Sequence, residues 1–517
     1  MKKINFSKSV ILLLLFTLSS CINDLDTVSK TDRTLADVLR DDPNAINGIV
    51  SKLYGSFALS GPSGPASSDI SDDAGSSPFL RGILNLQDFT ADGMKNRWGD
   101  DGLDQLTTTS DWDSSNKFFR FLYNRVYFTV PQCNNIISLL KSNDVPNKAQ
   151  YLAEARFLRS LAYFYMIDCF GKGVLVDEND LGSIIPKPQS SRLQMFNFVE
   201  SELLAIENDI PLTNSYGRAN RSAVRMLLAK LYLNAKVYTG TERYQDALVY
   251  TRKVITEGGY SLAPSFVSLF SGDNNVTSAK NEIIYQLIAD PVSSQSYGNT
   301  TYIVNGSLND ETMTPTDFGT TQNWKGHRAT KAWYGLFGNL VTSTDDRAKL
   351  FWTTGQNYEM NDYKLWKDGY PSIKFRNKNF IGPSINTDFS GTDFPLYRLA
   401  DAYLMAAECI IRTNGNTANA EALGFVNQVR SRSNATLATL AELNLDYIID
   451  ERGRELNLEG HRRTDLIRFD KFTSGSYLWP WKGNVVGGQA ISSNYNLFPI
   501  PLAAIGANPN LTQNPGY

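Results

Sequence analysis

The stretch Leu152-Ala-Glu-Ala-Arg-Phe-Leu-Arg-Ser-Leu-Ala-Tyr-Phe-Tyr-Met-Ile-Asp-Cys169 decides the fold class of this chain. Its small and bulky apolar residues recur every three or four positions, at Leu152, Ala155, Leu158, Ala162, Tyr165 and Cys169. This is the spacing that places side chains on one face of an α-helix. The stretch therefore predicts a long helix with one face directed into a core.

The same period recurs in five further segments. They lie near 196–210, 224–238, 247–254, 399–410 and 418–429, and Gly240 and Gly258-Gly259 follow two of them as helix stops. Small alanines alternate with bulky Leu and Tyr, which lets paired helices approach closely. Helix pairs at roughly tetratricopeptide length favour a mainly α protein with a tetratricopeptide-like helix-pair scaffold. The alternative on periodicity alone is a bundle of unrelated antiparallel helices.

Three stretches lack this helical period: residues near 57–114, 260–394 and 472–517. They are rich in Ser, Gly, Asp, Asn, Thr or aromatic residues. Long irregular stretches inside a compact protein are usually functional loops. We therefore expect one domain, residues 21–517, whose helical scaffold is interrupted by stretches that fold over it as an irregular, loop-rich cap.

Composition narrows the classes of function. The 517 residues are 42% apolar and 20% charged, which is typical of a globular protein. A net charge of −3 argues against nucleic acid as a partner. The two histidines, His327 and His461, leave little for histidine-based catalysis or metal binding. Cys133, Cys169 and Cys409 lie in helical apolar stretches, and we expect buried free thiols.

The N-terminus has the pattern of an export signal. Lys2 and Lys3 precede an apolar run at 10–16, and Leu18-Ser-Ser-Cys21 follows. The run is about half of the ~20 residues needed to span a bilayer. Leu-Ser-Ser-Cys resembles a bacterial lipobox, which predicts a lipoprotein signal peptide at 1–20 and acyl chains on Cys21 that anchor the protein to a membrane. The alternative is an ordinary secretory signal.

No motif for a phosphate loop, a dinucleotide turn, a zincin or a nucleophile elbow occurs. The densest charged segment, 450–463, places Glu451, Glu455 and Glu459 on one expected helix face among arginines. A catalytic hypothesis takes two of these carboxylates as a glycosidase pair. Arginines would depress their pKa values, whereas a general acid needs a raised one, so we favour a structural ion-pair network.

The charged segment also carries a family resemblance. Glu451-Arg-Gly-Arg-Glu-Leu-Asn-Leu-Glu-Gly-His-Arg-Arg-Thr-Asp465-Leu-Ile-Arg468 resembles the E-R-x-x-E-x-x-x-E-G-x-R-x-x-D-L-x-R stretch of the SusD/RagB family. The segments 154–171, 394–408 and 498–517 resemble three further family blocks, in family order and across nearly the whole chain. The resemblance implies a SusD-like α/α superhelix of four tetratricopeptide-like helix pairs with an irregular ligand-binding face.

The resemblance also implies a role. Family members are non-catalytic lipoproteins of the bacterial cell surface that bind oligosaccharides. They lie as a lid on a SusC-like TonB-dependent transporter in the outer membrane. Four short blocks, at 21–26, 297–298, 320–324 and 477–483, are similar to the starch-binding member of the family. A starch-type glucan is therefore the expected ligand, with a β-glucan as the alternative.

Carried over position by position, the resemblance assigns a glycan-binding arc. Its stacking rings fall on Trp98, Tyr297 and Trp324, and its polar partners are Asp73, Arg81 and Asp101. Aromatic rings stack on the apolar faces of pyranose rings, while carboxylate and guanidinium groups bind vicinal hydroxyls. Two positions depart from the relative: Asn96 replaces a second Trp and Asp101 replaces an Asn. Trp479 and Trp481 are expected to be structural.

Two further alternatives remain at this stage. Asp273, Asn274 and Asn275 offer oxygen ligands of the type that calcium uses, although Asx-rich turns have the same composition. A lipid-anchored glycoside hydrolase is the rival function, with carboxylates among Asp73, Asp100 and Asp101 or in segment 451–459. We expect no other cofactor and no catalytic residue.

Overall fold

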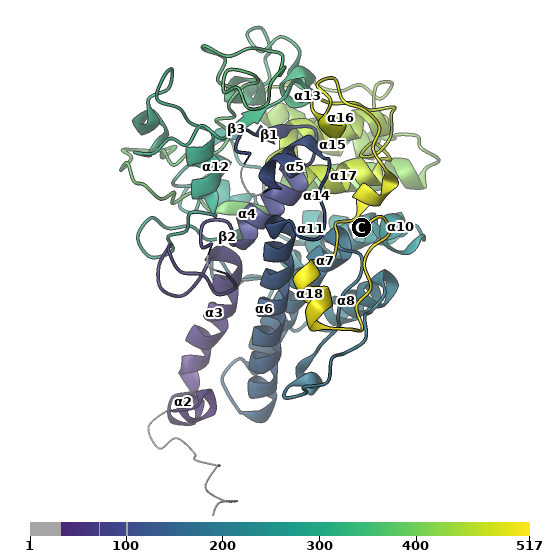
Figure 1. The fold of residues 1–517 in the computed structure, drawn as a ribbon. Helices are drawn as coiled ribbons and strands as arrows, with labels where there is room; N and C mark the ends of the chain where they lie inside the picture. The colour runs from purple at the N-terminus through teal and green to yellow at the C-terminus, as the bar shows by residue number, and fades with distance from the viewer. Residues whose placement is uncertain (1–32, 72, 100–101) are drawn as a thin grey trace, which may run out of the picture.

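The computed structural model describes residues 33–517 except 72, 100 and 101. Cys21, Asp100 and Asp101 lie outside this range, so the lipid anchor and one polar partner of the arc are not described. The helices dominate the architecture, with a few short strands (Figure 1). None of the helices in the described part of the chain is long and apolar enough to cross a bilayer.

The first half of the chain contains the longest helices. They are α2 (Leu35–Asp41), α3 (Ile46–Ala58), α4 (Phe79–Leu84), α5 (Leu103–Thr108), α6 (Lys117–Ser142), α7 (Lys148–Cys169), α8 (Arg192–Ile206), α9 (Arg221–Leu233), α10 (Ala235–Thr239) and α11 (Tyr244–Glu257). The second half contains α12 (Thr300–Gly306), α13 (Lys331–Tyr334), α14 (Leu399–Thr413), α15 (Ala420–Arg432), α16 (Leu445–Leu456), α17 (Arg462–Arg468) and α18 (Leu502–Ala507).

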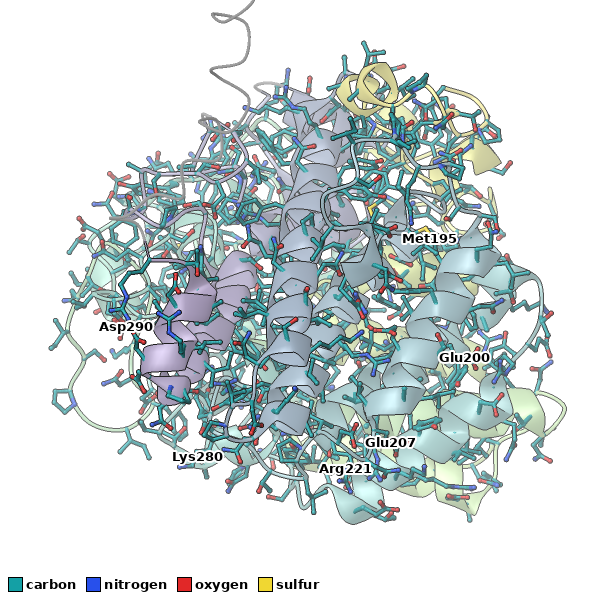
Figure 2. All side chains as sticks on the ribbon, turned by 90° about the horizontal axis from the view of Figure 1, so that it is seen from below. Met195, Glu200, Glu207, Arg221, Lys280 and Asp290 are labelled. Carbon is teal, nitrogen blue, oxygen red and sulfur yellow. The ribbon has the colours of Figure 1, made fainter. Side chains whose placement is uncertain are left out.

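The predicted helices form and pack as successive neighbours. Helix α7 lies between α6 and α8, α11 lies between α9 and α14, and α14 also packs on α15 and α16. The stretch at 224–238 is divided at Asn234 into α9 and α10, and α10 ends at Gly240 in the left-handed conformation. Figure 2 shows Glu200 on α8, Glu207 just after the end of α8 and Arg221 at the start of α9, where Arg221 Nη2 donates to the Asn208 carbonyl at 3.2 Å.

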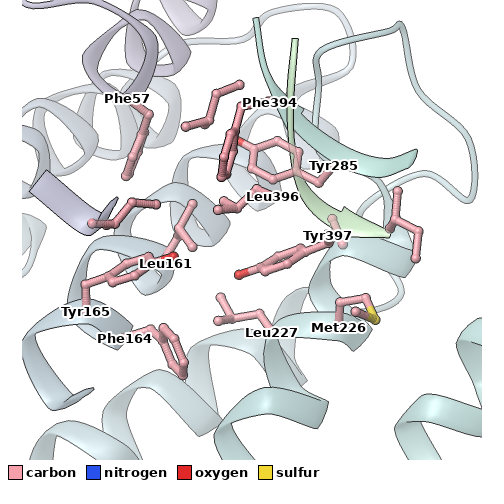
Figure 3. Close-up of a cluster of buried hydrophobic side chains, with 14 of the residues drawn as sticks. Phe57, Leu161, Phe164, Tyr165, Met226, Leu227, Tyr285, Phe394, Leu396 and Tyr397 are labelled. Atoms are coloured by element: carbon pink, nitrogen blue, oxygen red, sulfur yellow. The ribbon is translucent and has the colours of Figure 1, made fainter. Parts of the chain in front are cut away.

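A single large core joins the helices to a strand pair. Figure 3 shows Phe57, Leu161, Tyr165, Leu227 and Tyr285 gathered in this core, from α3, α7, α9 and a strand. The three cysteines, Cys133, Cys169 and Cys409, are buried free thiols, as expected. Trp479 is also buried, in a smaller cluster with Leu466 and Phe472, which agrees with a structural role.

The strands are short and connect distant parts of the chain. Within the described residues, β1 (Met94–Asn96) pairs antiparallel with β3 (His327–Ala329), in the register Met94–Ala329 and Asn96–His327. Likewise β2 (Ile283–Leu287) pairs antiparallel with β4 (Phe394–Arg398). Segments that are more than 100 residues apart are thereby fixed side by side.

The irregular stretches do not all form one cap. The first two, around β1, α12, β3 and α13, gather at the end of the molecule opposite α2 (Figure 1). The third runs back along the helices, because Asn514 Nδ2 donates to the Phe170 carbonyl at 2.9 Å and Asn508 Nδ2 donates to the Lys187 carbonyl at 3.0 Å. The end of this third stretch, around residues 508–514, therefore lies against the helical part of the molecule.

Candidate functional site

Trp98 and Trp324 lie side by side because of the β1–β3 pairing. Trp98 follows β1 and Trp324 precedes β3, and just beyond the strands the Arg97 N–H donates to the Gly326 carbonyl at 2.9 Å. The two indole rings have centroids 6.5 Å apart and planes inclined by 49°. Both side chains are half-buried. The result is a V of two inclined indoles, each partly exposed.

The Trp98 ring rests on a rigid base. It packs on Tyr302 at 6.1 Å and on His327 at 5.6 Å between ring centroids. A Cβ on Gly326 would come within 2.6 Å of the indole, so glycine is needed for this close approach. Asn96 is fully buried, and its Oδ1 accepts a hydrogen bond from the Trp98 backbone N–H at 2.7 Å. Asn96 therefore supports the neighbouring indole and presents no side chain to a ligand.

Arg81, on α4, connects this base to the loop that carries Asp73. Its guanidinium carbon lies 4.3 Å from the centroid of the Tyr302 ring. Its Nη1 donates to the Gly75 carbonyl at 3.1 Å. The half-buried arginine thus contacts the ring that also supports Trp98, and it fixes the loop beside it.

Asp73 is held in its ionised form. Burial alone would raise the pKa of its carboxyl group, but hydrogen bonds from Lys117 Nζ at 3.0 Å and from the Ser76 N–H at 2.9 Å outweigh this and lower the pKa. A carboxylate with a lowered pKa accepts hydrogen bonds and is a poor general acid. Asp73 is thus suited to bind hydroxyl groups and unsuited to protonate a leaving group.

Tyr297 lies against the same loop. Its side chain is 41% exposed, and its ring centroid is 4.9 Å from that of Phe389. A Cβ built on Gly75 would lie 3.8 Å from the Tyr297 Cβ, and the Arg81 N–H donates to the Gly298 carbonyl at 3.0 Å. Among the described residues, the structure therefore brings together five of the six predicted site residues. Asp73, Arg81 and Tyr297 form one group and the two indoles another, joined through Tyr302.

Arg125 of α6 also binds the loop of residues 60–77. This side chain is 1% exposed. Its Nη2 donates to the carbonyls of Ser60 at 3.0 Å and of Ser77 at 3.3 Å, and its Nη1 lies 3.5 Å from Asp69 Oδ2. One guanidinium therefore binds both ends of the loop, and burial lowers its pKa to about 10.

Three of these supporting residues were missed by sequence reasoning. Lys117 and Arg125 lie in a stretch whose helical period was not predicted, and Tyr302 lies in a stretch predicted to be irregular. The spacing of eight residues between Lys117 and Arg125 places both on one face of a helix, and this was the available signal. A separate cavity of about 420 Å³, bounded by Tyr54, Phe128 and Leu287 among others, contains none of the predicted site residues.

The side-chain oxygens of Asp273 already accept hydrogen bonds from backbone N–H groups. Asp273 Oδ1 accepts from the Phe380 N–H at 2.7 Å, and Oδ2 accepts from the Ile381 N–H at 2.9 Å. Asn274 Nδ2 donates to the carbonyls of Leu269 and Asp393. These contacts are typical of an Asx-rich turn that joins two loops. In the described part of the chain, no cluster of three or more His, Cys, Asp or Glu residues has the geometry of a metal site.

The acidic residues at 451–459 form a buried ion-pair network. Glu451 and Glu455 lie on α16, whereas Glu459 lies beyond the end of that helix, so the expectation of one helix face is wrong for Glu459. All three are fully buried. Burial would raise the pKa of Glu455, but Arg432, Arg398 and Arg347 outweigh it and lower that pKa. Such a carboxylate does not serve as a general acid.

Comparison with known proteins identifies the class to which this fold and site belong. A sequence model of the SusD family matches residues 281–517. A curated relative is 32% identical over 99% of this chain and 98% of its own length. The chain belongs to the SusD family.

The relative just described is the starch-binding protein SusD of Bacteroides thetaiotaomicron. A SusD-like protein of Bacteroides ovatus is 25% identical over 67% of this chain and 64% of its own length. Among solved structures, a SusD superfamily protein from Parabacteroides distasonis superposes with a TM-score of 0.71 at 21% identity, covering 92% of this chain and 99% of the other. A surface glycan-binding protein A from B. thetaiotaomicron, in complex with laminarihexaose, superposes with a TM-score of 0.69 at 22% identity, covering 91% and 99%. These structures share the fold.

Proposed function

We propose that this protein is a non-catalytic, surface-exposed lipoprotein of the outer membrane that binds a starch-type glucan. The observation that carries the proposal is the V of Trp98 and Trp324 beside the Asp73–Arg81–Tyr297 group. Two indoles inclined by 49° suit a curved chain of sugars better than a flat one. The carboxylate and guanidinium beside them provide acceptors and donors for hydroxyl groups. The starch-binding name of the 32% identical relative supports the same ligand.

Delivery to a SusC-like TonB-dependent transporter completes the proposed role. It is supported by family membership and by the lipobox at Cys21, which would keep the protein at the membrane that contains such a transporter. Affinity purification of the full-length protein from its own outer membrane tests this partnership. Recovery of a TonB-dependent barrel in stoichiometric amount is expected, and its absence after mild detergent extraction would remove the transporter from the proposal.

The decisive experiment removes both rings. In the double variant Trp98→Ala, Trp324→Ala, affinity for maltoheptaose should fall at least ~100-fold, because each stacking ring is worth about 2 kcal/mol or more and every 1.4 kcal/mol is tenfold. Calorimetric titration measures the affinity, and circular dichroism checks the fold. The matched control is Trp481→Ala, since Trp481 is half-buried too but contacts Tyr363 at 4.9 Å between ring centroids.

Two other outcomes have distinct meanings. If the protein binds laminarin oligosaccharides but does not bind maltoheptaose, the glycan-binding role stands and a β-glucan replaces the starch-type ligand. Laminarin is the competitor to test because a protein of the same fold was solved in complex with laminarihexaose. Release of reducing sugar from starch, laminarin or xylan by the purified protein would favour the hydrolase instead. Retained maltoheptaose affinity in the folded double variant would place the site elsewhere.

A further inference from the structure

The eight tryptophans of this chain divide into two groups by burial. Four are buried: Trp112, Trp333, Trp366 and Trp479. Four are half-buried: Trp98, Trp324, Trp352 and Trp481. Trp98 and Trp324 form the candidate site, and Trp481 rests on Tyr363. Trp352 is the half-buried indole that has no part in the site described so far.

Trp352 is fixed at the surface. Its backbone N–H donates to the Pro371 carbonyl at 2.9 Å, and its ring meets Phe318 edge-on at 6.2 Å between centroids. Its indole N–H donates to Thr312 Oγ1 at 3.1 Å, and Thr312 is exposed. A core tryptophan, such as Trp333 at 3% exposure, is covered by its neighbours. Trp352 is instead anchored through its backbone, one ring edge and its N–H, and part of the residue remains accessible.

Two segments lead from Trp352 to Trp324. The first begins at Phe318, which packs on Trp352, and continues along 319–323 to Trp324. This segment is tied down at Asn305, whose side chain accepts from Thr320 Oγ1 at 2.8 Å and whose carbonyl accepts from the Trp324 N–H at 2.7 Å. The same chain segment thus supports one indole at each of its ends.

The second connection is the turn of residues 308–312. The Lys325 N–H, next to Trp324, donates to the Leu308 carbonyl at 3.0 Å. Lys325 Nζ binds Asp310 at 2.8 Å and Glu311 at 3.0 Å. Thr312, at the end of the turn, holds the Trp352 indole. Exposed polar groups therefore extend from one indole to the other.

We propose that the glycan site continues past Trp324, over Lys325 and the turn 310–312, to Trp352, and that this extension binds further residues of the same glucan chain. We call it the Trp352 subsite: Asp310, Glu311, Thr312, Lys325 and Trp352. The inference rests on the proposed function. Its chemistry repeats that of the main site, with an indole as a stacking surface and charged groups as partners for hydroxyls. Asp310 and Glu311 are 60% and 55% exposed, so they are accessible to a ligand.

The Trp352 subsite predicts that affinity depends on the length of the glucan chain. A short oligosaccharide is held at the Trp98–Trp324 pair and does not reach Trp352, whereas a long one contacts both. Wild-type protein should therefore bind long oligosaccharides more tightly than short ones. Trp352→Ala should leave the affinity for maltotriose unchanged and weaken binding of the longest oligosaccharides about tenfold, and so abolish the gain with length.

The experiment is a calorimetric titration of wild type, Trp352→Ala and Trp481→Ala with maltooligosaccharides of increasing length, and with laminarin oligosaccharides if those bind instead. A second variant, Asp310→Ala with Glu311→Ala, changes exposed residues only and should also reduce the gain with length, so the test does not depend on how Trp352→Ala folds. Trp481→Ala should behave as wild type.

The outcomes separate this inference from the function on which it rests. If Trp352→Ala and the acidic double variant keep the wild-type gain with length, the subsite is refuted while the glycan-binding function stands. An equal loss of affinity at every length also refutes it, because Trp352 would then act on the main site. If wild-type protein binds neither series, the proposed function fails and the subsite fails with it.

Discussion

Glu455 is a carboxylate without exposed surface that binds three arginines. Arg347 Nη1 donates to it at 2.8 Å, Arg398 Nη1 donates at 2.6 Å, and Arg432 is the third partner. The three arginines come from the 3-10 helix Asp346–Leu350, the end of β4 and α15, while Glu455 lies on α16. Removing the carboxylate would leave three buried cations with less compensation, so the residue is expected to matter for folding.

We therefore predict that Glu455→Ala lowers the free energy of unfolding by about 3–5 kcal/mol with little effect on glycan affinity in the folded fraction. Urea denaturation measures the first quantity and calorimetric titration the second. Glu421→Ala is the matched control: Glu421 pairs with Arg252 at 2.7 Å but is 41% exposed, and such pairs contribute about 0–1 kcal/mol. An unchanged unfolding midpoint with lost binding would contradict the structural assignment.

The same carboxylates predict how stability depends on pH. The pKa values of Glu455, Glu459 and Asp465 are lowered in the folded protein, because their basic partners outweigh burial. A lowered folded-state pKa stabilises the protein above the unfolded-state pKa of about 4, and this stabilisation is lost as the pH falls further. The melting temperature should thus drop steeply below about pH 4.5. Melting curves that stay flat from pH 6 to pH 3 would show that the network does not titrate with unfolding.

Two side chains on one face of helix α6 support the candidate site. Lys117 in its first turn pairs with Asp73, and Arg125 two turns later binds both ends of the 60–77 loop. A methionine at position 125 has a similar apolar stem but cannot bind the carbonyls of Ser60 and Ser77. The loop would then lose the contacts that fix Asp73 relative to Arg81.

We predict that Arg125→Met increases hydrogen exchange of the 60–77 amides and weakens glycan binding about tenfold, which corresponds to the ~1.4 kcal/mol of one lost polar contact. The affinity effect should vanish in an Asp73→Ala background, because both changes remove the same contact. Arg159→Met is the control, since Arg159 is equally buried but pairs with Glu178 and Glu202. Additive effects of the two substitutions would mean that Arg125 does not act through Asp73.

At the scale of elements, the local period of apolar residues predicts helices well but does not predict which strands pair. The stretch at 152–169 lies in α7 because its apolar period is unbroken. Helix α6 is longer, but the sequence indicated it only as a helical stretch around Cys133 without bounds, and it contains Pro131, a residue that normally ends a helix. The strands β1 and β3 have three residues each, too few for any periodicity, and their partners are remote.

The candidate site was predictable only through resemblance. Trp98, Tyr297 and Trp324 are 27 to 226 positions apart in sequence, and no local rule connects them. In the structure they are linked to Asp73 and Arg81 through contacts with Tyr302 and Gly75; that they bind a glycan stays a prediction. The resemblance did not predict the residues that support this site. Tyr302, Lys117 and Arg125 contact neighbouring groups of the site and belong to no motif.

At the scale of the whole molecule, attachment and fold are separable. The anchor is predicted at Cys21, whereas the core of the described residues is built from Leu39 onward. We expect Cys21→Ala to release a folded protein from the outer membrane, since acyl chains supply the attachment. Membrane fractionation followed by circular dichroism tests this. Retention of the variant after washing with high salt and carbonate would contradict the lipobox.

The pairing of β1 with β3 also sets an order of events during folding. Trp98 is made early in synthesis, but the strand that places it beside Trp324 ends only at residue 329. Contacts between remote segments form slowly, because closing the intervening loop costs chain entropy before any contact compensates for it. If the chain is exported from its N-terminus, as the proposed function requires, Trp98 and Trp324 cannot be brought together before residue 329 has emerged. In the proposed role, a chain held at an earlier stage of export would therefore lack the paired indoles.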